Sequence, residues 1–156
     1  MTVGAASKPP VQYTLRSVIP MVTLITGNKG SGKTKLLAER VNAAAQASDG
    51  SVICIEQKCK LMYEVRSRVR LIASDAYGIK NYDEFYGFIS GICAQDHDIT
   101  DLFVDATLRI GGRDYAALAA FLRRITGLEK NITLTISADK SELPKEIFEF
   151  CEEVVF

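Results

Sequence analysis

The 156-residue sequence predicts an α/β fold, a three-layer sandwich in which helices cover both faces of a mainly parallel sheet. Two observations support this prediction. Short apolar runs rich in β-branched residues alternate with helical stretches, which is typical of right-handed strand–helix–strand crossovers. A glycine-rich motif, Gly27–Thr34, lies directly between the first apolar run and the first helical stretch.

The first strand, motif and helix follow one another without a gap. Met21–Thr26 is apolar and reads as a buried strand, and Lys33–Ala47 has apolar residues at helical spacing. Asp49 and Gly50 then end the helix. The motif GNKGSGKT between them fits the pattern G-x-x-x-x-G-K-[ST].

The residue types in the motif indicate phosphate binding. Glycines let successive backbone N–H groups turn toward phosphate oxygens, and the open N-terminus of the following helix favours an anion. Lys33 is expected to reach the β- and γ-phosphates, and the Thr34 hydroxyl to bind Mg²⁺. The alternative is a glycine-rich turn that starts a helix. The predicted nucleotide-binding residues are Gly27, Asn28, Lys29, Gly30, Ser31, Gly32, Lys33, Thr34 and Lys35.

The later elements alternate between strand and helix patterns. Asn81, followed by Glu84 at the third helical position, is predicted to cap one of the helices. The predicted strands are Ser51–Glu56, Val69–Ala73, Leu102–Val104, Asn131–Asp139 and Glu153–Phe156. The predicted helices are a short turn over Leu61–Arg66, then Tyr82–Asp96, Asp114–Leu128 and Glu142–Phe150.

Composition limits the class of protein. Hydrophobic residues make up 47% and charged residues 24%, which is ordinary for one globular domain, predicted here over residues 21–156. Residues 1–20, which include Pro9 and Pro10, are predicted to be a loose N-terminal extension. The net charge of zero gives no indication of a nucleic-acid partner. No apolar run is long enough to cross a bilayer, so a cytoplasmic protein without membrane contact is expected.

The cysteines predict neither a zinc site nor a disulfide framework. Cys54, Cys59, Cys93 and Cys151 contain no C-x-x-C pair, and His97 is the single histidine. Reduced cysteines are therefore expected.

An aspartate follows a buried strand at the point where a nucleotide site needs a carboxylate. Leu102–Val104 is apolar, and Asp105 stands at its carboxyl end. We expect Asp105 to bind Mg²⁺ through water, with Thr34 as the other protein group at the metal. The alternative is that Asp105 caps the next turn.

Taken together, GNKGSGKT and LFVD resemble the P-loop NTPases, and the order of elements is similar to the RecA-like branch. The resemblance implies a P-loop NTPase fold with ATP and Mg²⁺ as cofactors. It also implies that the strand ending at Ser137 separates the Asp105 strand from the loop strand. An extra strand or insert precedes Asp105. VRLIASDAYGI, YDEFYGFI and DLFVDATLRI also resemble small bacterial ATP-binding proteins labelled twitching-motility-ATPase-like.

The chain departs from the RecA-like pattern at the residue after Asp105. RecA-like hydrolases usually carry a glutamate there to orient water, whereas this chain has Ala106. Glu56 is the first candidate for the missing catalytic base and Asp139 the second, although either could be a solvated carboxylate. Arg109 is a candidate for neutralising transition-state charge, as is Arg113, and an exposed loop arginine is the alternative for both.

These features favour an ATP-binding protein with Mg²⁺-dependent hydrolysis that is slow or stimulated by a partner. A nucleoside-type small-molecule kinase and a non-hydrolysing, nucleotide-gated module that binds a protein partner are the alternatives. ATP and ADP are the expected ligands, and a homo-oligomer or an unidentified protein partner is compatible with the sequence. Arg66, Arg68 and Arg70 could form a basic strand face that grips phosphates, although a solvated edge is preferred.

Overall fold

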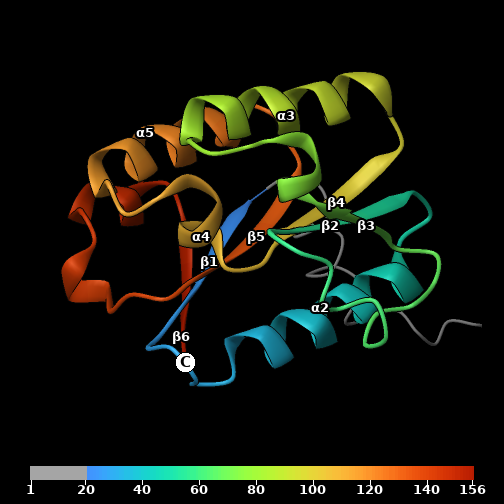
Figure 1. The fold of residues 1–156 in the computed structure, drawn as a ribbon, viewed down its shortest axis with the longest axis horizontal. Helices are drawn as coiled ribbons and strands as arrows, with labels where there is room; N and C mark the ends of the chain where they lie inside the picture. The colour runs from blue at the N-terminus through green and yellow to red at the C-terminus, as the bar shows by residue number, and fades with distance from the viewer. Residues whose placement is uncertain (1–20) are drawn as a thin grey trace, which may run out of the picture.

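The computed structural model describes residues 21–156, so the predicted extension over residues 1–20 lies outside the described residues. The described chain forms a parallel sheet with the strand order β3-β2-β4-β5-β1-β6 (Figure 1). Its strands are β1 Val22–Thr26, β2 Ser51–Glu56, β3 Arg70–Ala73, β4 Ile99–Val104, β5 Asn131–Ile136 and β6 Glu152–Val155. Its α-helices are α2 Lys33–Ala47, α3 Tyr82–Gln95, α4 Thr107–Gly111 and α5 Tyr115–Thr126. The 3₁₀ turns are η2 Ser74–Tyr77, η3 Lys140–Glu142 and η4 Lys145–Glu149.

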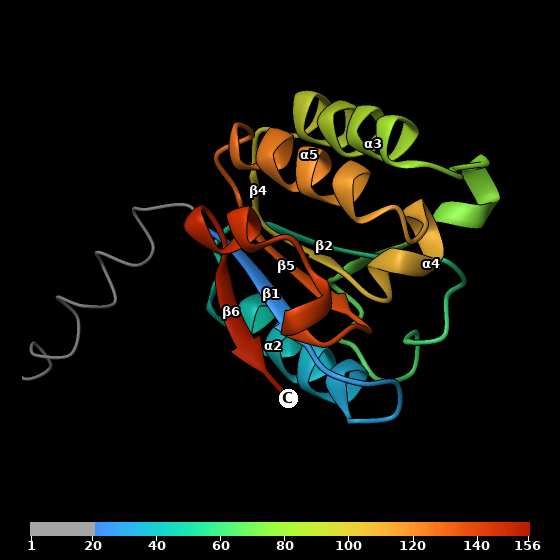
Figure 2. The same cartoon turned by 90° about the vertical axis from the view of Figure 1, so that its left-hand side faces the viewer.

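Helices cover both faces of the sheet, which confirms the predicted three-layer α/β sandwich. Figure 2 shows α2 on one face and α3 with α5 on the other. Successive residues of β2 therefore enter different cores: Cys54 packs in the cluster with α2, and Ile53 and Ile55 in the cluster with α3 and α5. A strand buried on both faces needs apolar residues at successive positions, which explains the continuous apolar run VICI over residues 52–55.

The strand order agrees with the order that the RecA-like resemblance implies. β5 lies between β4 and β1, pairing Leu134 with Val104 on one side and with Leu24 on the other. Because all these strands are parallel, their carboxyl ends meet at one edge of the sheet. The residues that follow β1, β4 and β5, and Glu56 at the end of β2, are brought to this edge.

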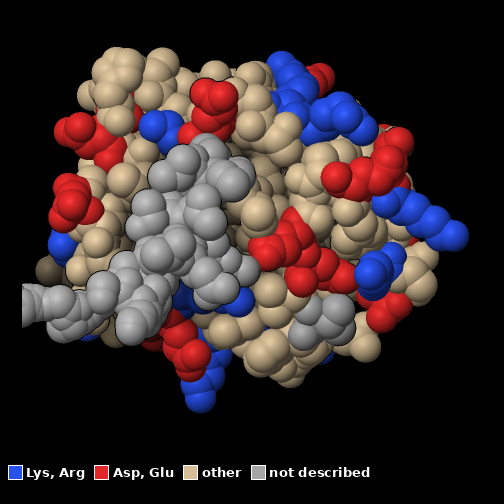
Figure 3. All heavy atoms as spheres, turned by 180° about the vertical axis from the view of Figure 1, so that it is seen from behind, with Lys and Arg blue, Asp and Glu red and all other residues tan. Residues whose placement is uncertain are grey.

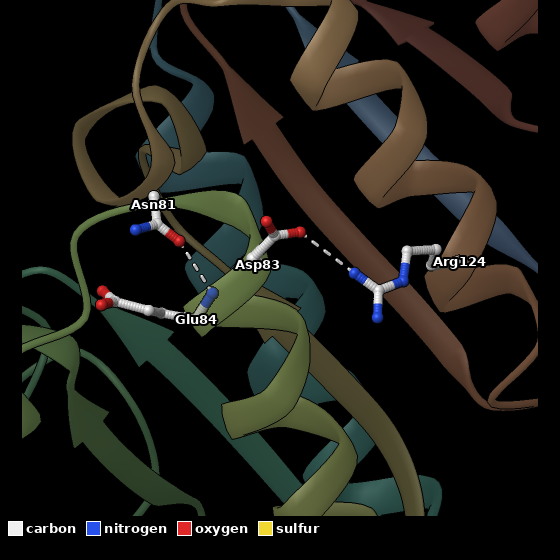
Figure 4. Close-up of polar contacts among 4 residues, drawn as sticks. All are labelled: Asn81, Asp83, Glu84 and Arg124. Carbon is white, nitrogen blue, oxygen red and sulfur yellow. Dashed lines mark hydrogen bonds and ion pairs between the residues drawn. The ribbon is translucent and has the colours of Figure 1, made fainter.

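The cap of α3 forms as predicted (Figure 4). The Asn81 side chain accepts a hydrogen bond of 2.8 Å from the Glu84 N–H, and the Glu84 carboxylate accepts one from the Lys80 N–H. Asp83 and Arg124 form an ion pair of 3.2 Å that joins α3 to α5. Their side chains are 95% and 48% exposed, so this pair contributes at most about 1 kcal/mol.

The predicted helical turn over Leu61–Arg66 forms as a single hydrogen-bonded turn, in which the Leu61 carbonyl accepts from the N–H groups of Glu64 at 2.9 Å and Val65 at 3.1 Å. A side chain from α2 also contacts this segment. The Asn42 amide donates to the Glu64 carbonyl at 2.8 Å, and the Asn42 amide oxygen accepts from the Arg66 N–H at 2.8 Å. The following strand begins at Arg70.

The three alternating arginines are exposed, which agrees with the preferred solvated edge, and the alternative of a basic strand face does not form. Arg70 alone of the three lies in β3. The Arg66 guanidinium instead contacts the Gln46 side chain, and that of Arg68 contacts the Ser48 carbonyl. On the face of the molecule in Figure 3, acidic and basic side chains are interspersed over the described surface.

Two further differences concern the second half of the chain. The predicted helix over Glu142–Phe150 is replaced by η3 and η4, because Pro144 disfavours helical backbone at the residue before it. The short helix α4 was not predicted. Each helix of the described part of the chain is too short or too polar to span a membrane.

Candidate functional site

A cavity of about 400 Å³ opens at the carboxyl edge of the sheet. It is lined by the glycine motif and by residues that follow β2, β4 and β5. Outside the motif, the cavity is lined by the predicted residues Glu56, Asp105 and Arg109, and also by Ser137, which follows β5. The predicted residues of the motif that line it are Lys29, Gly30, Gly32, Lys33 and Thr34. Residues that are up to about one hundred positions apart in the sequence thus line one cavity.

The glycine loop has a backbone that other residues would adopt at a cost. Gly30 and Gly32 have φ of +83° and +99°, in the left-handed region. A Cβ on Gly32 would also lie 2.8 Å from the ring of Phe156. The backbone conformation therefore favours glycine at position 32, and any larger residue there would also have to displace the exposed Phe156 ring.

The N-terminus of α2 is open toward the cavity. Gly32 is the N-cap and offers no side chain to the first-turn N–H groups, and the first turn holds no acidic residue. Uncapped N–H groups and the positive end of the helix dipole favour an anion at this point. Gly27, Asn28, Ser31 and Lys35, which were also predicted to bind nucleotide, do not line the cavity.

Lys33 lies beside the loop that precedes it. Its side chain is 5% exposed, and its ammonium donates to the Asn28 carbonyl at 2.8 Å and to Ser31 Oγ at 3.4 Å. Burial lowers the pKa of Lys33, and the nearby Asp105 carboxylate opposes this effect. A phosphate oxygen would offer this ammonium a negatively charged partner in the same cavity.

The predicted metal residues are in direct contact. The Thr34 hydroxyl lies 3.2 Å from each carboxylate oxygen of Asp105. Asp105 is 8% exposed, and its N–H donates to the Ile55 carbonyl of β2 at 2.9 Å. The structure thus brings the loop threonine and the β4 aspartate together. A hydroxyl and a carboxylate are oxygen ligands of the kind Mg²⁺ prefers.

Thr135 holds Asp105 in this orientation and was not predicted. Its hydroxyl donates to Asp105 Oδ1 at 2.7 Å and accepts from the Ala106 N–H at 2.7 Å. Ala106 has φ of +52°, a left-handed conformation that is unusual for alanine. No sequence signal identifies Thr135, because its contact with Asp105 depends on the register between β4 and β5.

The two candidate bases lie in different environments. Glu56 is 4% exposed and lines the cavity, where Oε2 accepts from the N–H groups of Lys60 at 3.1 Å and Leu61 at 3.2 Å. Burial raises the pKa of Glu56, the Asp105 charge adds to the rise, and the two backbone donors oppose it. Asp139 does not line the cavity, and its carboxylate accepts from the Ser141 N–H at 3.0 Å as the cap of η3.

Three further cationic residues lie at or beside the site. Arg109, on α4, lines the main cavity, and Arg113 lines a neighbouring cavity of about 150 Å³. Lys60, which was not assigned a role from the sequence, also lines the main cavity.

Comparison with known proteins supports the fold. No protein-family model matches the chain, and no curated protein matches it. The structure is similar to that of the flagellar accessory protein FlaH from Methanocaldococcus jannaschii, with a TM-score of 0.54 and 19% sequence identity. The similarity covers 84% of this chain and 67% of that chain. Together with the strand order, it supports an α/β fold in which helices cover a parallel sheet.

Proposed function

We propose that this protein binds ATP with Mg²⁺ at the glycine loop and hydrolyses it slowly or when a partner stimulates it. The observation that carries the proposal is the contact between the Thr34 hydroxyl and the Asp105 carboxylate beside the open N-terminus of α2. Phosphates would bind to the loop amides and to Lys33, because these groups offer donors and positive charge at one point.

The residues fit a magnesium ion that is held partly by the nucleotide. The described residues contain no group of three or more His, Cys, Asp or Glu side chains that could hold a metal ion. Mg²⁺ commonly binds one or two protein groups together with phosphate oxygens and water, which matches Thr34 and Asp105. When bound, the ion would supply positive charge against the phosphate oxygens.

Slow turnover is supported by the environment of Glu56. Its Oε2 already accepts two backbone hydrogen bonds, and Ala106 rather than a carboxylate follows Asp105. A general base must be within reach of the proton it removes, and a carboxylate engaged in this way is less available. The same observation favours the second candidate, a nucleotide-gated module that binds a protein partner without hydrolysis.

The test measures Mg²⁺-ATP and ADP binding by calorimetry for the wild type and for Lys33→Ala. Loss of a charge-assisted contact is expected to weaken ATP binding roughly 10- to 100-fold. Lys145→Ala, an exposed lysine outside the cavity, is the matched control and is expected to bind like the wild type. Lys33→Ala with wild-type affinity would contradict the proposal. Phosphate release by the wild type separates hydrolysis from the non-hydrolysing module.

A further inference from the structure

We infer that Lys60 contacts the terminal phosphate of the bound nucleotide, and that Glu56 positions the loop that carries Lys60. This inference rests on the proposed function, because it assigns further residues to the same cavity. It gives the segment between β2 and β3 a role in distinguishing ATP from ADP.

Contacts of the residues before and after Lys60 in the chain fix the position of its backbone. The buried carboxylate of Glu56, at the end of β2, accepts from the N–H groups of Lys60 and Leu61. The Leu61 side chain is 2% exposed and packs in the core cluster that includes the inner face of α2. The Lys60 N–H also lies 2.8 Å from the Lys58 carbonyl, which closes a tight turn. The backbone of Lys60 is thus attached to the sheet edge and to the core.

Lys60 is among the residues that line the cavity. Its positive charge acts on the Glu56 carboxylate, where it opposes the rise in pKa. Within residues 21–156, the Lys60 ammonium has no salt-bridge partner. A cation held beside a cavity in this way is available to an anion that enters it.

The sheet order indicates which phosphate Lys60 would meet. The loop amides follow β1, whereas Lys60 follows β2, and β5 and β4 lie between these two strands. A phosphate chain anchored in the amides and passing Asp105 at the end of β4 extends toward the end of β2. Its terminal phosphate therefore lies nearest to Lys60, while the phosphates of ADP stay nearer to Lys33.

Charge complementarity points in the same direction. ATP carries one more phosphate group than ADP, and its negative charge would lie between Glu56 and Asp105, two carboxylates that line the same cavity. Repulsion by these carboxylates disfavours a third phosphate unless cations offset it. Lys60 is the lysine at that end of the cavity.

The test compares the affinities for Mg²⁺-ATP and Mg²⁺-ADP in the wild type, Lys60→Ala, Lys60→Arg and Lys58→Ala. Lys60→Ala is expected to weaken ATP binding roughly 10-fold or more while ADP binding changes less than about 2-fold. Lys60→Arg should retain the preference for ATP. Lys58→Ala is the control, because Lys58 is exposed, is in the same loop and does not line the cavity.

The positioning role of Glu56 is tested by a double-mutant cycle. Glu56→Ala should reduce the preference for ATP as Lys60→Ala does, and the double variant should be no worse than Lys60→Ala alone. Glu56→Gln, whose amide oxygen can still accept from the Lys60 and Leu61 N–H groups, should keep the preference for ATP over ADP. If Glu56→Ala also keeps the wild-type preference, the positioning role is refuted. An unchanged preference in Lys60→Ala, with binding lost in Lys33→Ala, would refute the role of Lys60 and leave the proposed function intact. A wild type that binds neither nucleotide would refute both.

Discussion

Replacing Thr135 by valine tests whether the aspartate of β4 is oriented by the neighbouring strand. Valine keeps the shape of threonine but removes the hydroxyl that joins Asp105 Oδ1 to the Ala106 N–H. Thr135 is 1% exposed, so water cannot readily replace the lost partner. The substitution therefore leaves a backbone donor without an acceptor and removes one of the donors to the Asp105 carboxylate.

The magnitude follows from these two losses. An unsatisfied buried N–H costs about 1–3 kcal/mol, and the lost hydrogen bond to a carboxylate contributes less than its full value because Thr34 still donates to Asp105. We expect Thr135→Val to lower the free energy of unfolding by about 2–4 kcal/mol. For a chain of this size this corresponds to a decrease in Tm of roughly 5–15 °C.

The assay is urea denaturation of the wild type, Thr135→Val and Thr135→Ser, with Mg²⁺-dependent ATP binding measured in parallel. Thr135→Ser keeps the hydroxyl and should lose about 1 kcal/mol for the deleted methyl group. Thr133→Val is the control on the same strand, because Thr133 is half-buried and does not line the cavity. ATP affinity in Mg²⁺ should fall roughly tenfold for Thr135→Val, since groups that orient a metal ligand affect binding by this order. Stability and affinity equal to those of Thr133→Val would refute the reasoning.

Two further predictions follow from the loop and from Glu56. Gly32→Ala is expected to lower the free energy of unfolding by about 1–2 kcal/mol, because alanine is strained at a φ of +99°, and to weaken ATP binding. Gly87→Ala is the control: this residue lies on α3 with open space around it, so the variant should not destabilise the protein in urea denaturation. Burial raises the pKa of the Glu56 carboxyl in the folded protein, so the folded state binds the carboxyl proton more tightly than the unfolded state does. The contribution of Glu56 to the free energy of unfolding therefore falls as the pH rises from the ordinary pKa of glutamate through the raised one. Urea denaturation at a series of pH values should show this fall for the wild type relative to Glu56→Gln, and a constant difference between the two would contradict it.

The half of the site that depends on local sequence was predictable. A strand, a glycine loop and a helix are contiguous, so the motif alone indicates where the loop amides and Lys33 lie, and the bounds predicted for α2 are those observed. The cap at Asn81 was predictable for the same reason, because its partner Glu84 is three residues away.

The segment around Lys60 was only partly predictable. Its sequence suggested a helical turn, and one turn forms at Leu61, but two contacts that attach the segment were not predicted: the Asn42 side chain from α2, distant in the sequence, and the nearby buried Glu56 carboxylate. Neither contact has a periodic signature in the sequence. Local helix propensity is a weak preference and does not indicate either contact.

The network around Asp105 depends on register and not on spacing. Parallel pairing of Val104 with Leu134 sets Asp105 beside Thr135, and a slip of one residue would turn Thr135 to the opposite face of the sheet. The left-handed backbone of Ala106 then starts α4 immediately after the strand, and α4 carries Arg109 to the cavity. The turn at Ala106 thus sets both the orientation of the Asp105 carboxylate and the position of Arg109. A substitution that removes the Thr135 hydroxyl is therefore expected to alter both. A comparison of Thr135→Val with Arg109→Ala in ATP binding would therefore show less than additive effects.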